Sequence, residues 1–298
     1  MRYSKQHVLT KLLLTAVCFA SSLPSAGSNL AFTYGFGSGQ YQSYDFRASF
    51  DIPKLPVQFE LNYNHVRGDG TELLTETGAG FSWNITDWAI ANFRYLTIKE
   101  DVFEITGQEY GVAFYLNPLW KSSLNTRLDI GLGDYQYDLN VRQNVQTLIA
   151  GRVPDQRRFS LGLSQELTKG VSVYGNYDEY HYTADPAFLA SRLLRRFRQS
   201  TNAAVTLTSV PKYAYGFGVG WDATDKLSLR ASYANTSTVI GQIQDSQRLG
   251  LSYEINDALE LNSGVTLSYS NALLRNGNTV IPASTSAVIE FGLRYAFP

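Results

Sequence analysis

The most regular feature of this sequence is a two-residue alternation of apolar and polar positions. It is clearest in residues 285–297, which read TSAVIEFGLRYAF. One parity of this segment is apolar throughout, with Ala287, Ile289, Phe291, Leu293, Tyr295 and Phe297. The other parity holds small and charged residues, among them Glu290, Gly292 and Arg294. Because successive side chains of a β-strand point to opposite faces, the segment predicts a strand with one apolar and one polar face.

The same alternation recurs in earlier segments that are separated by Gly, Asn, Asp and Pro residues. These segments are 30–36, 41–52, 57–63, 76–83, 89–95, 109–116, 124–132, 158–166, 171–178, 213–221, 227–233, 248–255 and 259–267. Together with the last one they predict an all-β fold, an antiparallel up-and-down meander of about fourteen strands. The range is about twelve to sixteen, since residues 203–208 could extend a strand or add one.

A transmembrane β-barrel explains the pattern better than a soluble sandwich or a lipocalin-like barrel, because a membrane barrel needs two-faced strands throughout. No apolar run beyond the N-terminus is long enough for a transmembrane helix, so a closed barrel is the membrane form that remains. Short turns follow the second, fourth and later even strands, and they predict a periplasmic rim opposite longer outer loops. The tryptophans lie beside these turns, where an aromatic girdle belongs: Trp83, Trp88, Trp120 and Trp221.

The C-terminal segment also resembles a known signal. Its alternating residues Phe291, Leu293, Tyr295 and Phe297 are similar to the last strand of bacterial outer-membrane β-barrels, which closes on an aromatic residue. Here Pro298 follows, so the aromatic is penultimate. The resemblance implies that the barrel assembly machinery reads this strand.

Over its whole length the chain resembles a small porin-type barrel. That resemblance implies a monomer in the bacterial outer membrane, in contact with its lipid and lipopolysaccharide. We expect neither an N-terminal hatch nor a plug domain, because alternation begins at residue 30.

The N-terminus is typical of a secretory signal peptide. Arg2, Lys5 and Lys11 precede or border a short apolar core at residues 12–20, and small residues follow. A membrane anchor is the alternative, but the apolar stretch is short for one. We therefore predict a signal peptide at residues 1–26 and a barrel domain at residues 27–298. The single cysteine, Cys18, falls within the signal, which leaves no disulfide or thiolate metal site in the mature chain.

Charge and residue content exclude several classes of function. From totals of 25 basic and 26 acidic residues, loss of three basic residues with the signal leaves 22 against 26, a net charge of −4. This net charge does not indicate a nucleic-acid-binding protein, which would carry a basic surface. His65 and His181 are the only histidines left, on segments far apart in the meander, and no cluster has metal-ligand spacing. We expect no enzyme activity and no cofactor.

The charged residues of the predicted strands share the polar parity, which a membrane barrel directs into its lumen. They are Asp45, Arg47, Glu60, Glu76, Arg94, Glu109, Arg127, Asp129, Arg158, Glu166, Arg230, Arg248, Glu254, Glu260, Glu290 and Arg294. Two interpretations are open. The residues form either the wall of a water-filled pore that sorts solutes, or an ion-pair network that stiffens or fills the interior.

Two local features do not fit the simple pattern. The alternation breaks near residues 133–134, which predicts either a β-bulge or the edge of the lipid region. Residues 188–198, FLASRLLRRFR, form an amphipathic helical pattern with a basic cluster of Arg192, Arg195, Arg196 and Arg198. That segment predicts a constriction inside the lumen, a patch for lipid phosphates, or a solvated loop helix.

The sequence predicts a porin-like channel for passive or weakly selective passage of small hydrophilic solutes or an exported polymer. The alternative is a non-conducting structural barrel that docks a surface or envelope assembly complex.

Overall fold

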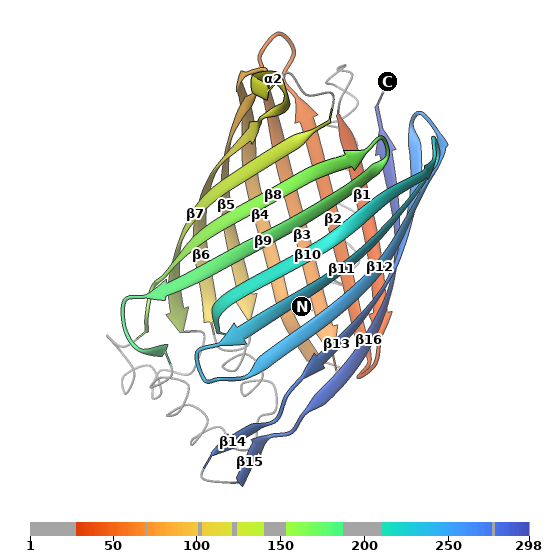
Figure 1. The fold of residues 1–298 in the computed structure, drawn as a ribbon. Coiled ribbons are helices and arrows are strands. Elements are labelled where there is room, and N and C mark those ends of the chain that lie inside the picture. Colours follow the sequence, from red (N-terminus) through yellow and green to blue (C-terminus); the bar gives the residue numbers. More distant parts are fainter. Residues whose placement is uncertain are drawn as a thin grey trace, which may run out of the picture.

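The protein is a closed antiparallel β-barrel, seen in a computed structural model that describes residues 28–68, 71–100, 103–120, 124–139, 153–186, 210–275 and 278–297 (Figure 1). The first half of the ring is β1 (Asn29–Gly37), β2 (Tyr41–Asp51), β3 (Val57–Gly68), β4 (Thr71–Thr86), β5 (Ala89–Glu100), β6 (Phe103–Tyr115) and β7 (Thr126–Leu139). The second half is β8 (Gln156–Thr168), β9 (Val171–Tyr182), β10 (Pro211–Thr224), β11 (Leu227–Thr238), β12 (Ile243–Asn256), β13 (Leu259–Ser270) and β16 (Ser284–Ala296). Each of these fourteen strands pairs with the next one in this order, and β1 pairs with β16. The predicted meander of fourteen strands is confirmed.

Little of the described chain lies outside the ring. A short helix, α2 (Asn117–Trp120), connects β6 to β7, and β14 (Leu273–Arg275) pairs with β15 (Asn278–Ile281) in the connection from β13 to β16 (Figure 1). In the described part of the chain no helix is long and apolar enough to cross a membrane. The predicted signal peptide, the 188–198 segment, residues 203–208 and Pro298 all lie outside the described residues.

The last strand closes the ring through two complete ladders. On one side β16 pairs with β1 from Asn29↔Ala296 to Gly37↔Val288, and on the other side it pairs with β13 along its length. The Phe297 amide also donates to the Ser28 carbonyl at 2.9 Å. The start of β1 and the end of β16 therefore lie at one rim, together with the turns after β2, β4, β8, β10 and β12 (Figure 1).

The opposite rim has the longest connections, at residues 140–155, 183–210 and 271–283. They join β7 to β8, β9 to β10 and β13 to β16. The asymmetry is only partial, because β1–β2, β3–β4 and β5–β6 are joined at the same rim by short connections.

The outer face of the barrel is a continuous apolar surface. Directly paired residues form a row across β11, β12, β13, β16 and β1: Ala231, Leu249, Val265, Ile289 and Phe36. Large side chains on this face are exposed, with Leu249 at 66% and Phe217 at 59%. A water-soluble protein does not expose an apolar surface of this extent, so this face contacts lipid. An even-stranded single-chain barrel of this kind is a bacterial outer-membrane protein.

Tryptophans mark the rim that carries the short turns. Trp83, Trp88 and Trp221 lie within a few residues of those turns, and Trp83 and Trp221 are 47% and 52% exposed. The side chain of Trp120 lies outside the described part of the structure. An exposed indole at this level suits the headgroup region, where its ring is in lipid and its N–H is hydrated.

The break in alternation near residue 133 is not a bulge. The ladders of β7 with β6 and β8 run through Gly133 without a register shift. The outward parity instead turns polar after Leu132, where Asp134 pairs with Arg157 at 3.0 Å. The inward parity turns aromatic at Tyr135 and Tyr137. Of the two explanations that the sequence offered, the structure supports the edge of the lipid region.

Replacing an outward residue with arginine should cost far more stability than replacing an inward one. For Leu249→Arg we expect a loss of about 2–4 kcal/mol in the free energy of unfolding in lipid vesicles, because the charge is placed in hydrocarbon. Ser252→Arg, on the inner face of the same strand and near Glu254 and Glu260, should lose less than about 1 kcal/mol. Urea titration of the refolded proteins measures both values. Equal losses would contradict the assignment of the two faces.

Candidate functional site

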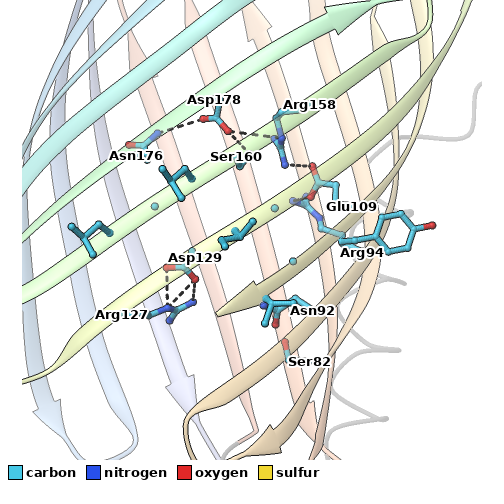
Figure 2. Close-up of a pocket in the computed structure, with 18 of the residues that line it drawn as sticks. Ser82, Asn92, Arg94, Glu109, Arg127, Asp129, Arg158, Ser160, Asn176 and Asp178 are labelled. Atoms are coloured by element: carbon cyan, nitrogen blue, oxygen red, sulfur yellow. Dashed lines mark hydrogen bonds and ion pairs between the residues drawn. The ribbon is translucent and has the colours of Figure 1, made fainter. Parts of the chain in front are cut away.

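The inner wall carries a chain of ion pairs whose residues come from five of the six strands β4–β9. Arg94 on β5 pairs with Glu76 on β4, and its Nη1 lies 3.5 Å from Oε2 of Glu109 on β6. Arg158 on β8 reaches the same Glu109, with 2.9 Å between Nη2 and Oε1, and its Nε lies 4.0 Å from Oδ1 of Asp178 on β9. We call these five residues the ionic ladder. Figure 2 shows most of it along the upper part of the site.

A glycine makes the ladder continuous. Glu109 and Arg158 are both paired to Gly133 on the intervening strand β7, so no side chain separates them. The ring of Tyr135 lies over Gly133 and Gly107, where an added Cβ would come within 2.7 and 2.5 Å of ring atoms. The Tyr135 hydroxyl donates to Glu109 Oε1 at 2.5 Å. Any larger residue at 107 or 133 would displace this ring and its contact with Glu109.

Asp178 belongs to the ladder but is absent from the predicted wall. It accepts hydrogen bonds from the Ser160 hydroxyl and from Asn176 Nδ2, the latter at 3.4 Å. The signal was present in the sequence, because Asp178 lies on the polar parity of its strand together with Asn176.

Eight of the other twelve charged residues of the predicted wall form ion pairs. Arg127 binds Asp129 two residues away, with Nη2 to Oδ1 at 2.7 Å, and also donates to the Tyr115 hydroxyl at 3.3 Å. The remaining pairs are Arg47–Asp45 at 3.0 Å, Arg248–Glu290 at 2.7 Å and Arg294–Glu260 at 3.5 Å. Most guanidinium groups of the wall are therefore already neutralised within the chain.

Four charged residues differ from this pattern. Glu60 accepts from the Ser82 hydroxyl at 3.2 Å, and Glu166 accepts from the backbone and side-chain amides of Asn125 at 3.0 and 3.1 Å. Arg230 and Glu254 have no ion pair within 4.0 Å among the residues that the structure describes. Arg230 faces Gly220 and Gly250 on the adjacent strands, so its charge lies on a bare section of wall.

An apolar and tyrosine-rich cluster covers part of the inner wall near the rim of the long connections. Leu96 and Phe103 are each only 3% exposed, and Phe103 packs edge-on against Tyr137 with ring centroids 5.4 Å apart. Gln156 accepts from the Tyr137 hydroxyl at 3.1 Å and donates to the Tyr182 hydroxyl at 2.7 Å. Ile105, which is paired with Tyr137, is also buried, at 6% exposed. We call these residues the inner aromatic cluster. The sequence interpretation missed it because it treated the whole inward parity as polar.

The opposite part of the wall is lined by small residues. β10 turns Gly216, Gly218 and Gly220 inward, on the parity that pairs with Asn176, Tyr174 and Ser172 of β9. The Tyr174 ring lies directly over Gly218, in space that a Cβ there would fill. The interior is therefore bulky on β4–β9. On β10–β13 it is thinly lined, with glycines such as Gly220 and Gly250 beside single charged residues such as Arg230.

Recesses remain along the bulky side. The largest has a volume of about 600 Å³ and is lined by residues of β3–β9, including Asn92, Asp129 and Ser160 (Figure 2). A second, of about 470 Å³, lies over β2–β5, and a third, of about 290 Å³, borders the inner aromatic cluster. The ion pairs therefore do not fill the whole interior.

The histidines are far apart. His65 lies on the lipid-facing parity of β3 between the rings of Tyr44 and Tyr63, and its Nδ1 is 2.9 Å from Thr75 Oγ1. His181 on β9 lies 3.4 Å from Glu179. Five strands separate β3 from β9 one way around the ring and seven the other way. Within the described ranges, no three His, Cys, Asp or Glu residues are placed to hold a metal ion.

The residues of the predicted assembly signal have two environments. Phe291, Leu293 and Tyr295 are exposed on the lipid face. Phe297 packs against the small cluster of Ala48 and Phe50 and contacts the Tyr295 ring at 5.1 Å. Recognition of this strand by the assembly machinery stays a prediction.

Removing Arg94 from the ladder should destabilise the barrel more than removing an arginine outside it. Arg94→Gln leaves Glu76 and Glu109 without their shared partner, and we expect a loss of about 1–3 kcal/mol in unfolding free energy. The Arg94 side chain is 38% exposed, which keeps the loss below that of a fully buried pair. Arg47→Gln is the control, since the Arg47 side chain is 71% exposed and its loss should stay under about 1 kcal/mol. If the two variants unfold at the same urea concentration, the ladder is not a structural unit.

Comparisons with known proteins support the fold. No protein-family model matches this sequence, and no curated protein matches it either. Among solved structures, a CymD monoaromatic hydrocarbon channel aligns with a TM-score of 0.53 at 9% identity, over 96% of this chain and 92% of that one. Pseudomonas aeruginosa OccK8 (OprE) aligns with a TM-score of 0.47 at 10% identity, over 91% and 97%. The KdgM porin aligns with a TM-score of 0.42 at 10% identity, over 91% and 99%. The alignment with the CymD channel shows that the two chains share a barrel fold, in agreement with the closed ring described above.

Proposed function

We propose that this protein is a passive channel for small hydrophilic solutes across the outer membrane. The observation that carries the proposal is the contrast between a continuous apolar outer face and an inner face of ion pairs, amides and hydroxyls with recesses of about 600 and 470 Å³. A polar interior of this kind favours water and water-soluble solutes. An exported polymer remains a sequence-level alternative within the same class.

The charge of the wall favours a mild preference for cations. The predicted wall holds seven arginines and nine carboxylates, a net charge of −2, and Asp178 adds a further negative charge. Because nearly all the arginines are neutralised by neighbouring carboxylates, acidic groups such as Glu254 supply the net field. Electrostatic attraction then raises the local concentration of cations.

The interior also bears on the kind of solute. The structural neighbour CymD is described as a monoaromatic hydrocarbon channel. In the present chain the middle of the wall is occupied by the ionic ladder and by polar side chains such as Asn92 and Ser160, which favours hydrophilic solutes over hydrocarbons.

The remaining partners belong to the membrane. The apolar outer face suits direct contact with outer-membrane lipid and lipopolysaccharide, and its uninterrupted course around the ring suits a monomer. The assembly machinery would recognise β16 through its alternating aromatic residues.

A non-conducting barrel that docks a surface or envelope complex is the second candidate. The observation in its favour is the inner aromatic cluster, because Leu96, Phe103 and Ile105 are buried on a wall that an open pore would hydrate. A barrel blocked at this level would not conduct.

Planar-bilayer recording of the refolded protein tests the proposal. We expect discrete conductance steps and, under a KCl gradient, a reversal potential that indicates weak cation selectivity. A preparation that is folded by its heat-modifiable mobility on a gel, yet silent in the bilayer, would reject the channel and favour the docking barrel.

Arg230 should set part of this selectivity. It has no ion pair among the described residues, so Arg230→Gln removes a positive charge from the lumen without leaving an unpaired carboxylate. The cation-to-anion permeability ratio should rise, while the urea midpoint should not change. Arg230→Lys is the matched control and should keep the parental ratio. A ratio that is the same in all three proteins would place Arg230 outside the conduction path.

A further inference from the structure

The recess of about 600 Å³ on the inner wall has a floor of bare glycine backbone. Gly111 on β6 pairs with Gly131 on β7, and Gly162 on β8 lies beside them, paired with Asp129. A Cβ added at Gly111 would meet nothing closer than 3.6 Å, and at Gly131 or Gly162 nothing closer than 3.3 Å. We call this floor and its rim the glycine niche. It differs from the wall at Gly107 and Gly133, where the ring of Tyr135 already occupies the space.

Polar side chains surround the niche on several sides. In Figure 2, Glu109, Arg158, Ser160 and Asp178 lie along one edge, while the Arg127–Asp129 pair and Asn92 with Ser82 lie along the other. Asn176 completes the upper edge beside Asp178. The rim therefore offers amides, hydroxyls and carboxylate oxygens at short spacing.

Most charges of the rim are already paired within the chain, and Glu60, which also lines the recess, accepts from the Ser82 hydroxyl at 3.2 Å. Arg127 is bound to Asp129, Arg158 to Glu109 and Asp178, and Arg94 to Glu76 and Glu109. No guanidinium group is therefore left to hold an anion, and each carboxylate of these pairs has an arginine next to it. Paired carboxylates still have lone pairs that accept hydrogen bonds from hydroxyl groups. This composition favours an uncharged solute with many hydroxyl groups over an ion.

An aromatic face borders the same recess. Tyr174 on β9 lines it, is partly exposed to the lumen and lies over Gly218. A glycine floor lets a solute come close to the backbone, and an exposed aromatic ring gives an apolar surface to the C–H groups of a sugar ring.

From this geometry we propose that the glycine niche is a binding subsite for neutral saccharides. The proposal rests on the channel function and refines it, since it names the class of solute that would pause on the way through. A volume of about 600 Å³ falls in the range of small-molecule sites in proteins.

Binding by the full chain, refolded in detergent, tests the subsite directly. The probes are glucose, sucrose and maltotriose, and galacturonic acid and putrescine are the charged comparisons. Saturation-transfer NMR measures the binding of each compound. We expect the neutral sugars to bind and the charged compounds to bind at least about tenfold more weakly. Stronger binding of either charged compound, or no binding of any sugar, would overturn the proposal.

A matched pair of glycine variants locates the site. Gly111→Leu fills the floor of the niche, and we expect sugar affinity to fall at least about tenfold. Gly250→Leu places the same side chain on the thinly lined wall, where the nearest atom to an added Cβ is 3.8 Å away, and it should bind like the parent. Asn92→Leu removes one amide from the rim and should also weaken binding, which keeps the test valid if Gly111→Leu does not fold. Equal affinities in all these proteins would reject the niche.

Conductance of the same proteins separates this proposal from the channel function. An open pore whose current is not reduced by maltotriose, in a protein that binds no sugar, would reject the subsite and leave the channel. A folded barrel that binds sugar but conducts no ions would reject the channel and leave the subsite.

Discussion

A β-sheet inside a membrane cannot leave an edge unpaired, because each unsatisfied backbone N–H or C=O costs several kcal/mol in hydrocarbon. In this protein the requirement is met where β16 pairs with both β1 and β13. Closure fixes the register of every strand, and register fixes which parity faces lipid. The apolar row through Leu249 and Val265 and the polar interior are both consequences of that single ring of hydrogen bonds.

Within the ring, glycine decides how the charged residues combine. Glu109 and Arg158 belong to strands that are not adjacent. They can meet because the residue between them, Gly133, has no side chain. The same absence of side chains at Gly111, Gly131 and Gly162 leaves a recess, whereas Tyr135 fills the space over Gly107. The interior is therefore neither an array of free charges nor a packed core. It is a wall on which paired charges alternate with bare backbone.

Much of the fold could be predicted from the sequence because a period of two is a direct property of strands. The alternation from Leu30 to Phe297 was sufficient to place the strands and their two faces. Pairing of particular charges could not be predicted, since it depends on how far each strand is shifted against the next. The pairing of Asp178 with Arg158 is an example, whereas the parity of Asp178 already indicated that it belongs to the wall. The inner aromatic cluster was missed because Leu96 and Ile105 break the rule that inward residues are polar. Their burial depends on three-dimensional packing that parity does not report.

The central claim is that a hydrated, polar interior runs through a barrel whose outer face is in lipid. Cysteine labelling in outer-membrane vesicles tests it most directly, because the only cysteine of the sequence is Cys18, within the predicted signal peptide. Ser232→Cys places a thiol on the inner face of β11, and Leu249→Cys places one on the lipid face of the neighbouring strand. A charged, membrane-impermeant maleimide should modify residue 232 and spare residue 249. Equal labelling of both positions, or labelling of residue 249 alone, would contradict the account.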